Sequence, residues 1–168
     1  MTERRPGRIL GLDLGERRIG VAVAEPDGYG ARPLVTIRRA ATIDADAAAL
    51  ARLVTEQGAT ELVVGLPLDA SGVDGTQAGI TRDWVTAVAA GLELEGLDVD
   101  WTFQDERLTS HLAEQRLGPM RRGRSGGPPS KTQRDAYRAR VDREAAAIIL
   151  DDALAGRRAA ASAMETSA

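Results

Sequence analysis

Residues 8–25 read RILGLDLGERRIGVAVAE, two short apolar runs joined by a polar turn. If the first run is a strand, its three alternating leucines point to one face, and Asp13 points to the other with Ile9 and Gly11. Both sets are apolar except for the aspartate, as in a strand that is covered on both sides. A carboxylate in such a position is costly unless a partner neutralises it. The stretch therefore predicts a central strand whose Asp13 needs a cation or a metal ion.

The composition favours a single globular domain over residues 1–168, with an ordered core at about 8–155. Hydrophobic residues make up 43% and charged residues 28% of the chain. Aromatic residues make up only 3%, which argues against an aromatic base-stacking platform. No apolar run is long enough for a signal peptide or a membrane span, and cysteine is absent. We therefore expect a cytoplasmic protein that has no disulfides and no membrane partner.

Periodicity and turn residues predict an α/β fold, a five-stranded mixed sheet flanked by helices on both faces. The strands are expected at 8–14, 19–25, 31–39, 61–67 and 98–106, the first three of them antiparallel. The helices are expected from Asp44 or Asp46 to about Gln57, at 76–95, from near Thr109 to 117, and at 133–155. Ile80, Trp84, Val85 and Val88 would form the inward face of the second helix. Residues 119–132 are expected to be a flexible basic loop, and 156–168 a frayed tail.

Positive charge is concentrated in residues 116–140, which hold eight basic residues and one acid, Asp135. The segment carries +7, and since the whole chain carries −3, the remainder carries −10. A basic sector on an acidic body is typical of proteins that bind a polyanion. The alternative is a solvated helix face followed by a charged loop. The candidate nucleic-acid contacts in this segment are Arg121, Arg122, Arg124, Lys131, Arg134 and Arg138.

Three acidic positions could meet at one edge of the predicted sheet. Asp105 and Glu106 end the last strand, and in open α/β sheets sites form at the carboxyl ends of strands. Asp142 heads an apolar stripe of the last helix, so it also points toward the sheet. Each acid has a simpler explanation: Asp13 could cap a turn, Asp105 or Glu106 could cap a helix, and Asp142 could pair with Arg138.

Clustered carboxylates repel one another unless cations neutralise them. Because the chain has one histidine, His111, and no cysteine, any metal must bind oxygen ligands, which favours Mg²⁺ or Mn²⁺. Two such ions about 3.5–4 Å apart can support phosphodiester cleavage. The acids therefore predict a two-metal site beside the basic sector.

Four blocks of the sequence resemble the YqgF/RuvX family. They are GLDLGERRIGVAVAEPDG at 11–28, VVGLPLDASGVDG at 63–75, DERLTS at 105–110 and VDREAAAIILDDAL at 141–154. Members of this family have the RNase H-like fold. They are assigned as Holliday junction resolvases and as nucleases for the 5′ end of the small-subunit ribosomal RNA precursor, pre-16S rRNA. The match covers most of residues 8–155.

The resemblance implies a metal-dependent nuclease with Asp13, Glu106 and Asp142 as its acidic, metal-binding residues. Asp105 could share or take the role of Glu106, although the alternation of a strand puts only one of them on the site face. Arg18 and Arg107 also match the family pattern and would steer phosphate or brace the acids. The sequence departs from the pattern at Ser110, where threonine is usual, and at Arg140, where lysine is usual.

Two further features have plainer interpretations. The loop in residues 63–75 could hold a phosphate near the helix that starts at Thr76, but a structural role at the sheet edge is favoured. His111 is expected to be an ordinary exposed helix residue rather than a proton shuttle.

Several functions remain open from the sequence. The substrate could be an RNA precursor, with ribosome association, or a DNA junction, which calls for a homodimer where an RNA nuclease could be a monomer. An actin-like ATPase or sugar-kinase phosphotransferase shares the strand–Asp–Gly turn, but it needs a second domain that 168 residues do not supply. A third alternative is an RNA-binding protein without catalysis.

Overall fold

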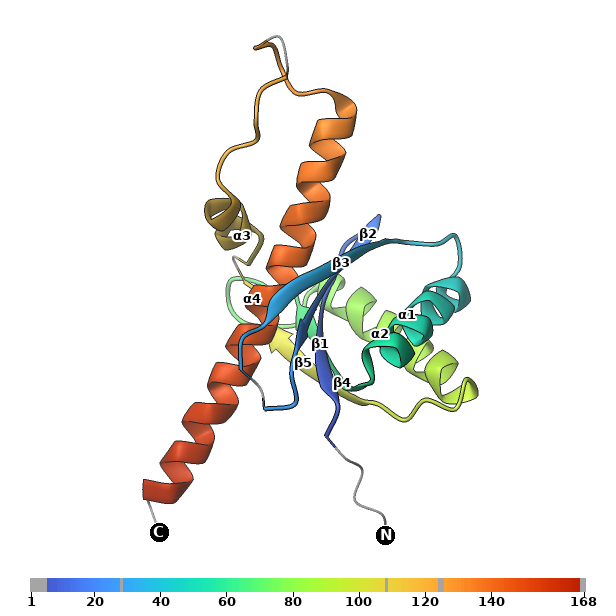
Figure 1. The fold of residues 1–168 in the computed structure, drawn as a ribbon. Coiled ribbons are helices and arrows are strands. Elements are labelled where there is room, and N and C mark those ends of the chain that lie inside the picture. The colour runs from blue at the N-terminus through green and yellow to red at the C-terminus, as the bar shows by residue number, and fades with distance from the viewer. Residues whose placement is uncertain (1–5, 28, 108, 124–125, 167–168) are drawn as a thin grey trace.

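The computed structural model describes residues 6–27, 29–107, 109–123 and 126–166. Five strands form one mixed sheet in the order β3-β2-β1-β4-β5 (Figure 1). The strands are β1 (Arg8–Leu14), β2 (Arg18–Ala24), β3 (Arg32–Arg38), β4 (Ala59–Leu66) and β5 (Asp100–Asp105). The first three are antiparallel, whereas β4 pairs in parallel with β1 and with β5. The predicted five-stranded mixed sheet is confirmed, and β1 is its central strand.

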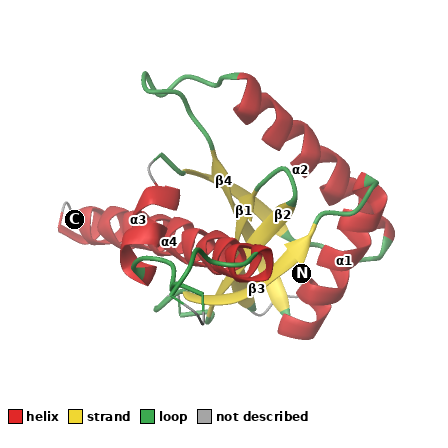
Figure 2. Cartoon of the chain, turned by 90° about the horizontal axis from the view of Figure 1, so that it is seen from above, coloured by secondary structure: helices red, strands yellow, loops and turns green. Residues whose placement is uncertain are grey.

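Helices α1 (Ile43–Gln57) and α2 (Thr76–Leu94) cover one face of the sheet, and α4 (Lys131–Thr166) crosses the other (Figure 2). The leucines of β1 pack in the larger core with side chains of α1 and α2 such as Leu50 and Trp84. Ile9 packs with α4 residues such as Ile149 in a second cluster. The alternation read from β1 is therefore correct, and Asp13 lies on the α4 side.

The boundaries of α1 follow ordinary capping chemistry. Thr42 accepts a hydrogen bond from the Ala45 backbone N–H at 3.3 Å, and Gly58 ends the helix in the left-handed conformation at φ 61°. The predicted start at Asp44 or Asp46 is thus slightly late. Asp46 lies in the first turn, but its side chain points into the protein.

Two predictions about helix packing and length are wrong. Trp84, Val85 and Val88 are buried as expected, but the Ile80 side chain is 50% exposed. The last helix starts at Lys131 and continues to Thr166, so residues 156–166 are not a frayed tail. Alanine, arginine and methionine favour helix there, and Arg157 anchors the extension through an ion pair with Glu61. The helix consequently projects beyond the sheet at both ends (Figure 1).

Helix α3 (Thr109–Leu117) packs on α4, where Ala113 joins Val141 and Ile148 in a small apolar cluster. In the predicted basic loop 119–132, residues 119–123 and 126–130 form no helix or strand, and a turn joins the Gly123 N–H to the Gly127 carbonyl at 3.0 Å. The end of the predicted loop is wrong, because Lys131 and Thr132 already belong to α4. Among the described helices, none is both long and apolar enough to cross a membrane.

Candidate active site

Asp13 lies near the end of β1 on the face that α4 covers. In the β1–β2 ladder it is paired with Gly20, and a Cβ on that glycine would overlap the backbone carbonyl of Asp142. The absence of a side chain at Gly20 therefore lets α4 approach the strand that carries Asp13. Burial raises the pKa of the Asp13 carboxyl to about 7, and the negative charge of Asp142 contributes to this rise.

Glu106 follows β5 directly and turns its side chain toward Asp13. Its carboxylate lies over β4, where a Cβ on Gly65 would overlap the Oε2 atom. That Oε2 atom is buried and has no hydrogen-bond partner among the described residues. Burial, followed by the charges of Asp13 and Asp105, raises the pKa of Glu106 to about 8. Both carboxyls thus occupy an environment that lacks compensating positive charge.

Asp105 has a different environment from its neighbour. Its carboxylate accepts hydrogen bonds from the Arg107 backbone N–H at 3.0 Å and from Arg107 Nε at 2.8 Å. These bonds hold the pKa of Asp105 below its usual range. Of the two adjacent acids, Glu106 is the one whose pKa the charge of Asp13 raises, and Arg107 braces Asp105 rather than the acidic cluster.

Asp142 reaches the same edge of the sheet from α4. It forms an ion pair with Arg18 Nε of β2, not with Arg138 as the simpler explanation held. Its charge is still close enough to raise the pKa of Asp13. The structure therefore brings Asp13, Glu106 and Asp142 to the same edge of the sheet, where Asp13 lies near each of the other two acids and Arg18 pairs with Asp142.

The donors at this place fit a hard divalent cation. All are carboxylate oxygens, the ligands that Mg²⁺ and Mn²⁺ prefer. Within the described ranges, no group of three or more acidic or histidine side chains is placed closely enough to hold one metal ion. However, the unpartnered buried Glu106 Oε2 and the buried carboxyl of Asp13 fit a pair of acids whose charge a bound cation would neutralise. Asp13 and Glu106 are thus the best-fitting ligands, and Asp142 the adjacent third acid.

A groove lined by basic residues adjoins the acids. One cavity of about 540 Å³ lies between the β1–β2 turn, the end of β3 and the start of α4. Its basic lining residues are Arg17, Arg18, Arg38, Arg39 and Lys131. A second cavity of about 440 Å³ shares the β1–β2 turn with the first and is lined by the arginines Arg17, Arg18 and Arg138 and by the acids Glu16, Asp135 and Asp142. We call these two cavities the basic groove.

Sequence reasoning found only part of the basic groove. Arg18, Lys131 and Arg138 were candidates, whereas Arg17 and the pair Arg38 and Arg39 were missed. The sequence does contain a pattern that indicates these arginines: ERR at 16–18 leads into β2, and IRR at 37–39 ends β3. Because β2 and β3 pair with Arg18 opposite Arg38, the two basic clusters lie side by side.

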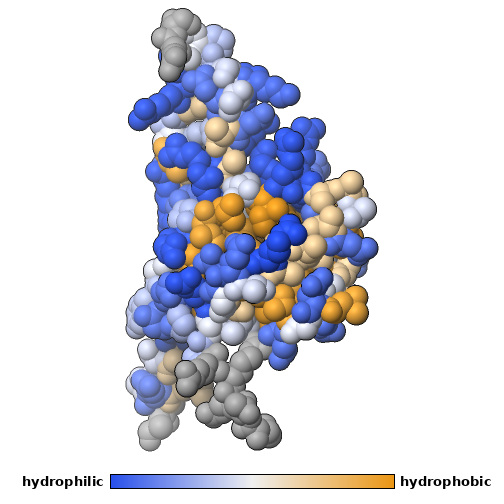
Figure 3. All heavy atoms as spheres, turned by 45° about the vertical axis from the view of Figure 1, so that its right-hand side comes forward, coloured by the Kyte–Doolittle hydropathy of each residue, from blue (hydrophilic) through white to orange (hydrophobic). Residues whose placement is uncertain are grey.

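The other predicted contacts lie along the loop or outside the described residues. Arg122 approaches the Gly126 carbonyl at 3.5 Å, and Arg134 donates to the Pro129 carbonyl at 2.6 Å, so both brace the loop. Arg121 is exposed, and Arg124 lies outside the described residues. Hydrophilic side chains dominate the upper part of the face in Figure 3, at the height where Figure 1 shows the first half of α4.

The two minor features behave as expected. His111 is exposed on α3 and contacts Gln115 Nε2 at 3.1 Å. The loop after β4 is held by its own hydrogen bonds, in which Asp69 accepts from the Ser71 and Val73 backbone N–H groups at 2.9 Å. These contacts are consistent with a structural role for the loop.

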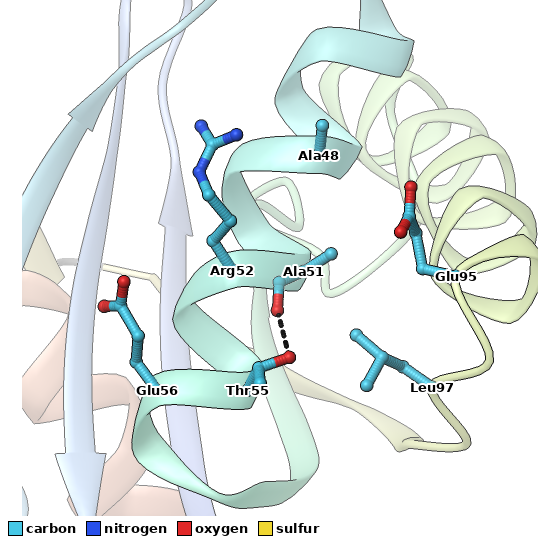
Figure 4. A pocket seen from close by; sticks show the side chains of 7 residues that line it. All are labelled: Ala48, Ala51, Arg52, Thr55, Glu56, Glu95 and Leu97. Carbon is cyan, nitrogen blue, oxygen red and sulfur yellow. Dashed lines mark hydrogen bonds between the residues drawn. The ribbon is translucent and has the colours of Figure 1, made fainter.

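A further cavity of about 420 Å³ lies between α1 and the segment after α2 (Figure 4). Arg52, Glu56 and Glu95 line it with small and apolar residues. It lies on elements that cover the opposite face of the sheet from α4, away from the acidic cluster.

Comparison with known proteins agrees with this architecture. A sequence model of the RuvX family, described as Holliday junction resolvase, matches residues 7–156. A protein of Chloroflexus aggregans is 43% identical over 89% of this chain and 94% of its own length. One of Roseiflexus sp. is 40% identical over 91% of this chain and 97% of its own. Both carry the provisional name pre-16S rRNA nuclease.

A solved structure extends the comparison to the fold. RuvC of T. thermophilus, in complex with Holliday junction substrate, aligns with a TM-score of 0.50 over 90% of this chain and 96% of its own. The sequence identity is 15%, so this likeness concerns the fold, which is RNase H-like. From the family match and the two bacterial relatives, the chain belongs to the RuvX family of nucleases.

Proposed function

We propose that this protein is a metal-dependent nuclease that hydrolyses RNA phosphodiester bonds and processes the 5′ end of pre-16S rRNA during ribosome biogenesis. The observation that carries the proposal is the pair formed by Asp13 and Glu106, two acids with raised pKa values and one unpartnered buried oxygen. The names of the two bacterial relatives favour the RNA precursor as substrate.

Asp13, Glu106 and Asp142 would hold two Mg²⁺ or Mn²⁺ ions. When bound, such ions lower the pKa of water and stabilise the charge that develops on the leaving oxygen. The protein contributes the arrangement of the ligands. β1 fixes Asp13, the β4 glycine leaves room for Glu106, and α4 delivers Asp142.

The basic groove would bind the backbone of the substrate strand. Its arginines lie on two strand ends and on α4, so they can contact successive phosphates beside the acids. Arg18 has a second role in this arrangement, because its ion pair orients Asp142 before substrate arrives.

A second candidate is resolution of Holliday junctions, which the description of the family model favours. That reaction requires symmetric cuts and therefore two sites in a homodimer. The RNA reaction requires one site and is compatible with a monomer.

Cleavage of three labelled substrates tests these proposals. The substrates are a pre-16S 5′ segment, an unrelated single-stranded RNA and a four-way DNA junction, each with Mg²⁺, Mn²⁺ or EDTA and beside Asp13→Asn. Metal-dependent cutting of the precursor, abolished in the variant, is the expected result. Symmetric cutting of the junction alone would replace the proposed RNA processing with Holliday junction resolution. No cutting in any mixture would favour a binding protein without catalysis.

A further inference from the structure

A cavity of about 300 Å³ opens on the side of the acidic cluster that faces α2. Glu106 lines one wall, and Leu14, Pro67 and Ile80 supply an apolar surface. Gln77 stands with them on the first turn of α2 and is exposed. The volume is at the lower end of the range for small-molecule sites, so it has room for a small planar group and not for a duplex.

Arg39 forms a rigid part of the cavity lining. Its Nε donates to Asp46 Oδ2 at 3.0 Å, and its terminal NH1 donates to the Gly15 carbonyl at 3.3 Å. Asp46 is only 1% exposed and also accepts from Trp84 Nε1 at 3.2 Å and from the Ala40 backbone N–H at 2.8 Å. A guanidinium held at two points has a fixed plane.

Packing in the hydrophobic core does not account for the position of the exposed Ile80 side chain. It is 50% exposed on a helix whose other large apolar residues of this stretch, Trp84 and Val85, are buried. In the cavity, Ile80 provides an apolar contact surface beside the polar side chains of Arg39 and Gln77. The amide of Gln77 offers both hydrogen-bond donors and an acceptor.

We propose that this cavity is a subsite for one unstacked nucleobase of the substrate strand, next to the bond that is cut. The base would lie against the Arg39 plane and Ile80, with its edge toward Gln77. Arginine planes and apolar side chains bind single-stranded bases in this way, which suits a chain with few aromatic residues. The inference rests on the proposed function and adds a substrate class, nucleic acid that is unpaired at the site of cleavage.

The preference for nucleic acid that is unpaired at the cleavage site follows from the size of the cavity. A base within a duplex remains stacked and paired, so it enters a pocket only after extrusion from the helix. The basic groove, in contrast, contacts phosphates and accepts either form. The two regions share Glu16 and Arg39 in their linings, so one strand can pass from the groove over the acids to the cavity.

Two measurements without catalysis test the subsite. Both use EDTA, so that binding is read without cleavage. In the first, a short single-stranded RNA containing 4-thiouridine is crosslinked to the protein by light, and the joined peptide is identified by mass spectrometry. We expect crosslinks at Gln77 or Ile80 that unlabelled single strand displaces, and no crosslinks at these positions when the same 4-thiouridine strand is annealed to its complement. Crosslinks confined to α4 and the basic loop would overturn the subsite.

The second measurement compares affinities for single strand and duplex. The variant Gln77→Ala with Ile80→Ala should bind single-stranded RNA about tenfold more weakly, the effect expected for one stacked base, and bind duplex as before. Both positions are on the surface of α2, so the fold should not depend on them. Leu94→Ala is the matched control, because Leu94 is 91% exposed at the other end of α2.

Equal weakening for single strand and duplex, or no weakening for either, would overturn the subsite. Parallel cleavage of the pre-16S segment by the unmodified protein reports separately on the proposed function. A protein that cuts the segment but shows no base-dependent difference is a nuclease without this subsite. A protein that shows the difference but cuts nothing has the subsite without the proposed activity.

Discussion

Trp84 on α2 donates its indole N–H to Asp46 on α1 across 3.2 Å, and the same carboxylate oxygen accepts from Arg39 at 3.0 Å. A core residue is thereby linked to a cation that borders both the basic groove and the cavity beside Glu106. The orientation of Arg39 is set from inside the protein.

Asp46→Asn should lower the free energy of unfolding by about 3 kcal/mol, because it leaves a largely enclosed guanidinium without its counter-charge. Trp84→Phe should lower it by about 1 kcal/mol, the value of one hydrogen bond. Urea unfolding followed by circular dichroism measures both. The exposed Asp83→Asn on α2 is the control and should change little. If Asp46→Asn matched this control, the link would have no role in stability.

Asp13→Asn and Asp142→Asn should each abolish cleavage and leave the circular dichroism spectrum unchanged. Each removes one anionic ligand from the proposed metal site while keeping the shape of the side chain. Asp105→Asn serves as control, because that carboxylate is engaged by Arg107, and it should keep most of the activity. Full cleavage by either of the first two variants would sink the assignment of the site.

The metal-free protein should become less stable as the pH rises from about 4 to about 8. The pKa of Asp13 is about 7 and that of Glu106 about 8 in the folded protein, both above their unfolded values. Between those limits the folded state holds more protons than the unfolded state, so stability falls with pH. The decrease is at most about 5 kcal/mol for each carboxyl.

Thermal unfolding in EDTA across this pH range measures the effect. Asp13→Asn should flatten the profile, whereas exposed Glu93→Gln at the far end of α2 should not. Added Mg²⁺ should stabilise the protein most at the alkaline end, where both carboxyls are charged. A metal-free profile that rises toward pH 8 would contradict the assignment of buried, uncompensated acids.

Gly65→Ala should reduce cleavage strongly, because the new methyl group would occupy the space of the Glu106 carboxylate and of the Ile149 side chain. Gly79→Ala is a matched change on α2 with no atom in the way, and it should leave cleavage intact. Comparing kcat for the two variants with the precursor RNA makes the test. Equal rates would mean that Glu106 does not need its present position.

Joint replacement of Arg121, Arg122 and Arg124 by glutamine should weaken RNA binding and reduce its dependence on salt. The slope of log affinity against log salt falls by roughly one unit for each phosphate that the protein no longer neutralises. Binding titrations at several salt concentrations measure that slope. Arg52→Gln, on the face of the sheet away from α4, provides the control. An unchanged slope would show that this loop does not touch the phosphates.

Local sequence patterns were sufficient to predict the strands of the sheet and the faces on which Asp13 and Asp142 lie. The alternation in β1 correctly placed Asp13 on one face, and the helical period correctly turned Asp142 toward the sheet. The strand alternation also predicted that only one of Asp105 and Glu106 could face the site. These features depend on neighbours in the chain, which a sequence displays directly.

The predictions that were wrong or incomplete concern features that depend on contacts between segments distant in the sequence. Ile80 fits the apolar period of α2, but the helix passes the edge of the core there and leaves it beside a cavity. Asp46 was expected only as a possible start of the helix, whereas its side chain bonds Arg39 and Trp84, which lie outside that helix. The end of α4 was misjudged because its support, Glu61, lies on β4.

The ion pair between Arg18 and Asp142 joins residues 124 positions apart. Ribosomes make a chain from its N-terminus, and the β1–β2 hairpin contains only contacts that are close in sequence. Asp142 is among the last parts of the core to be synthesised. The nascent chain therefore carries an incomplete acidic cluster until α4 has been synthesised, and the proposed nuclease acquires its full set of carboxylates only at that point.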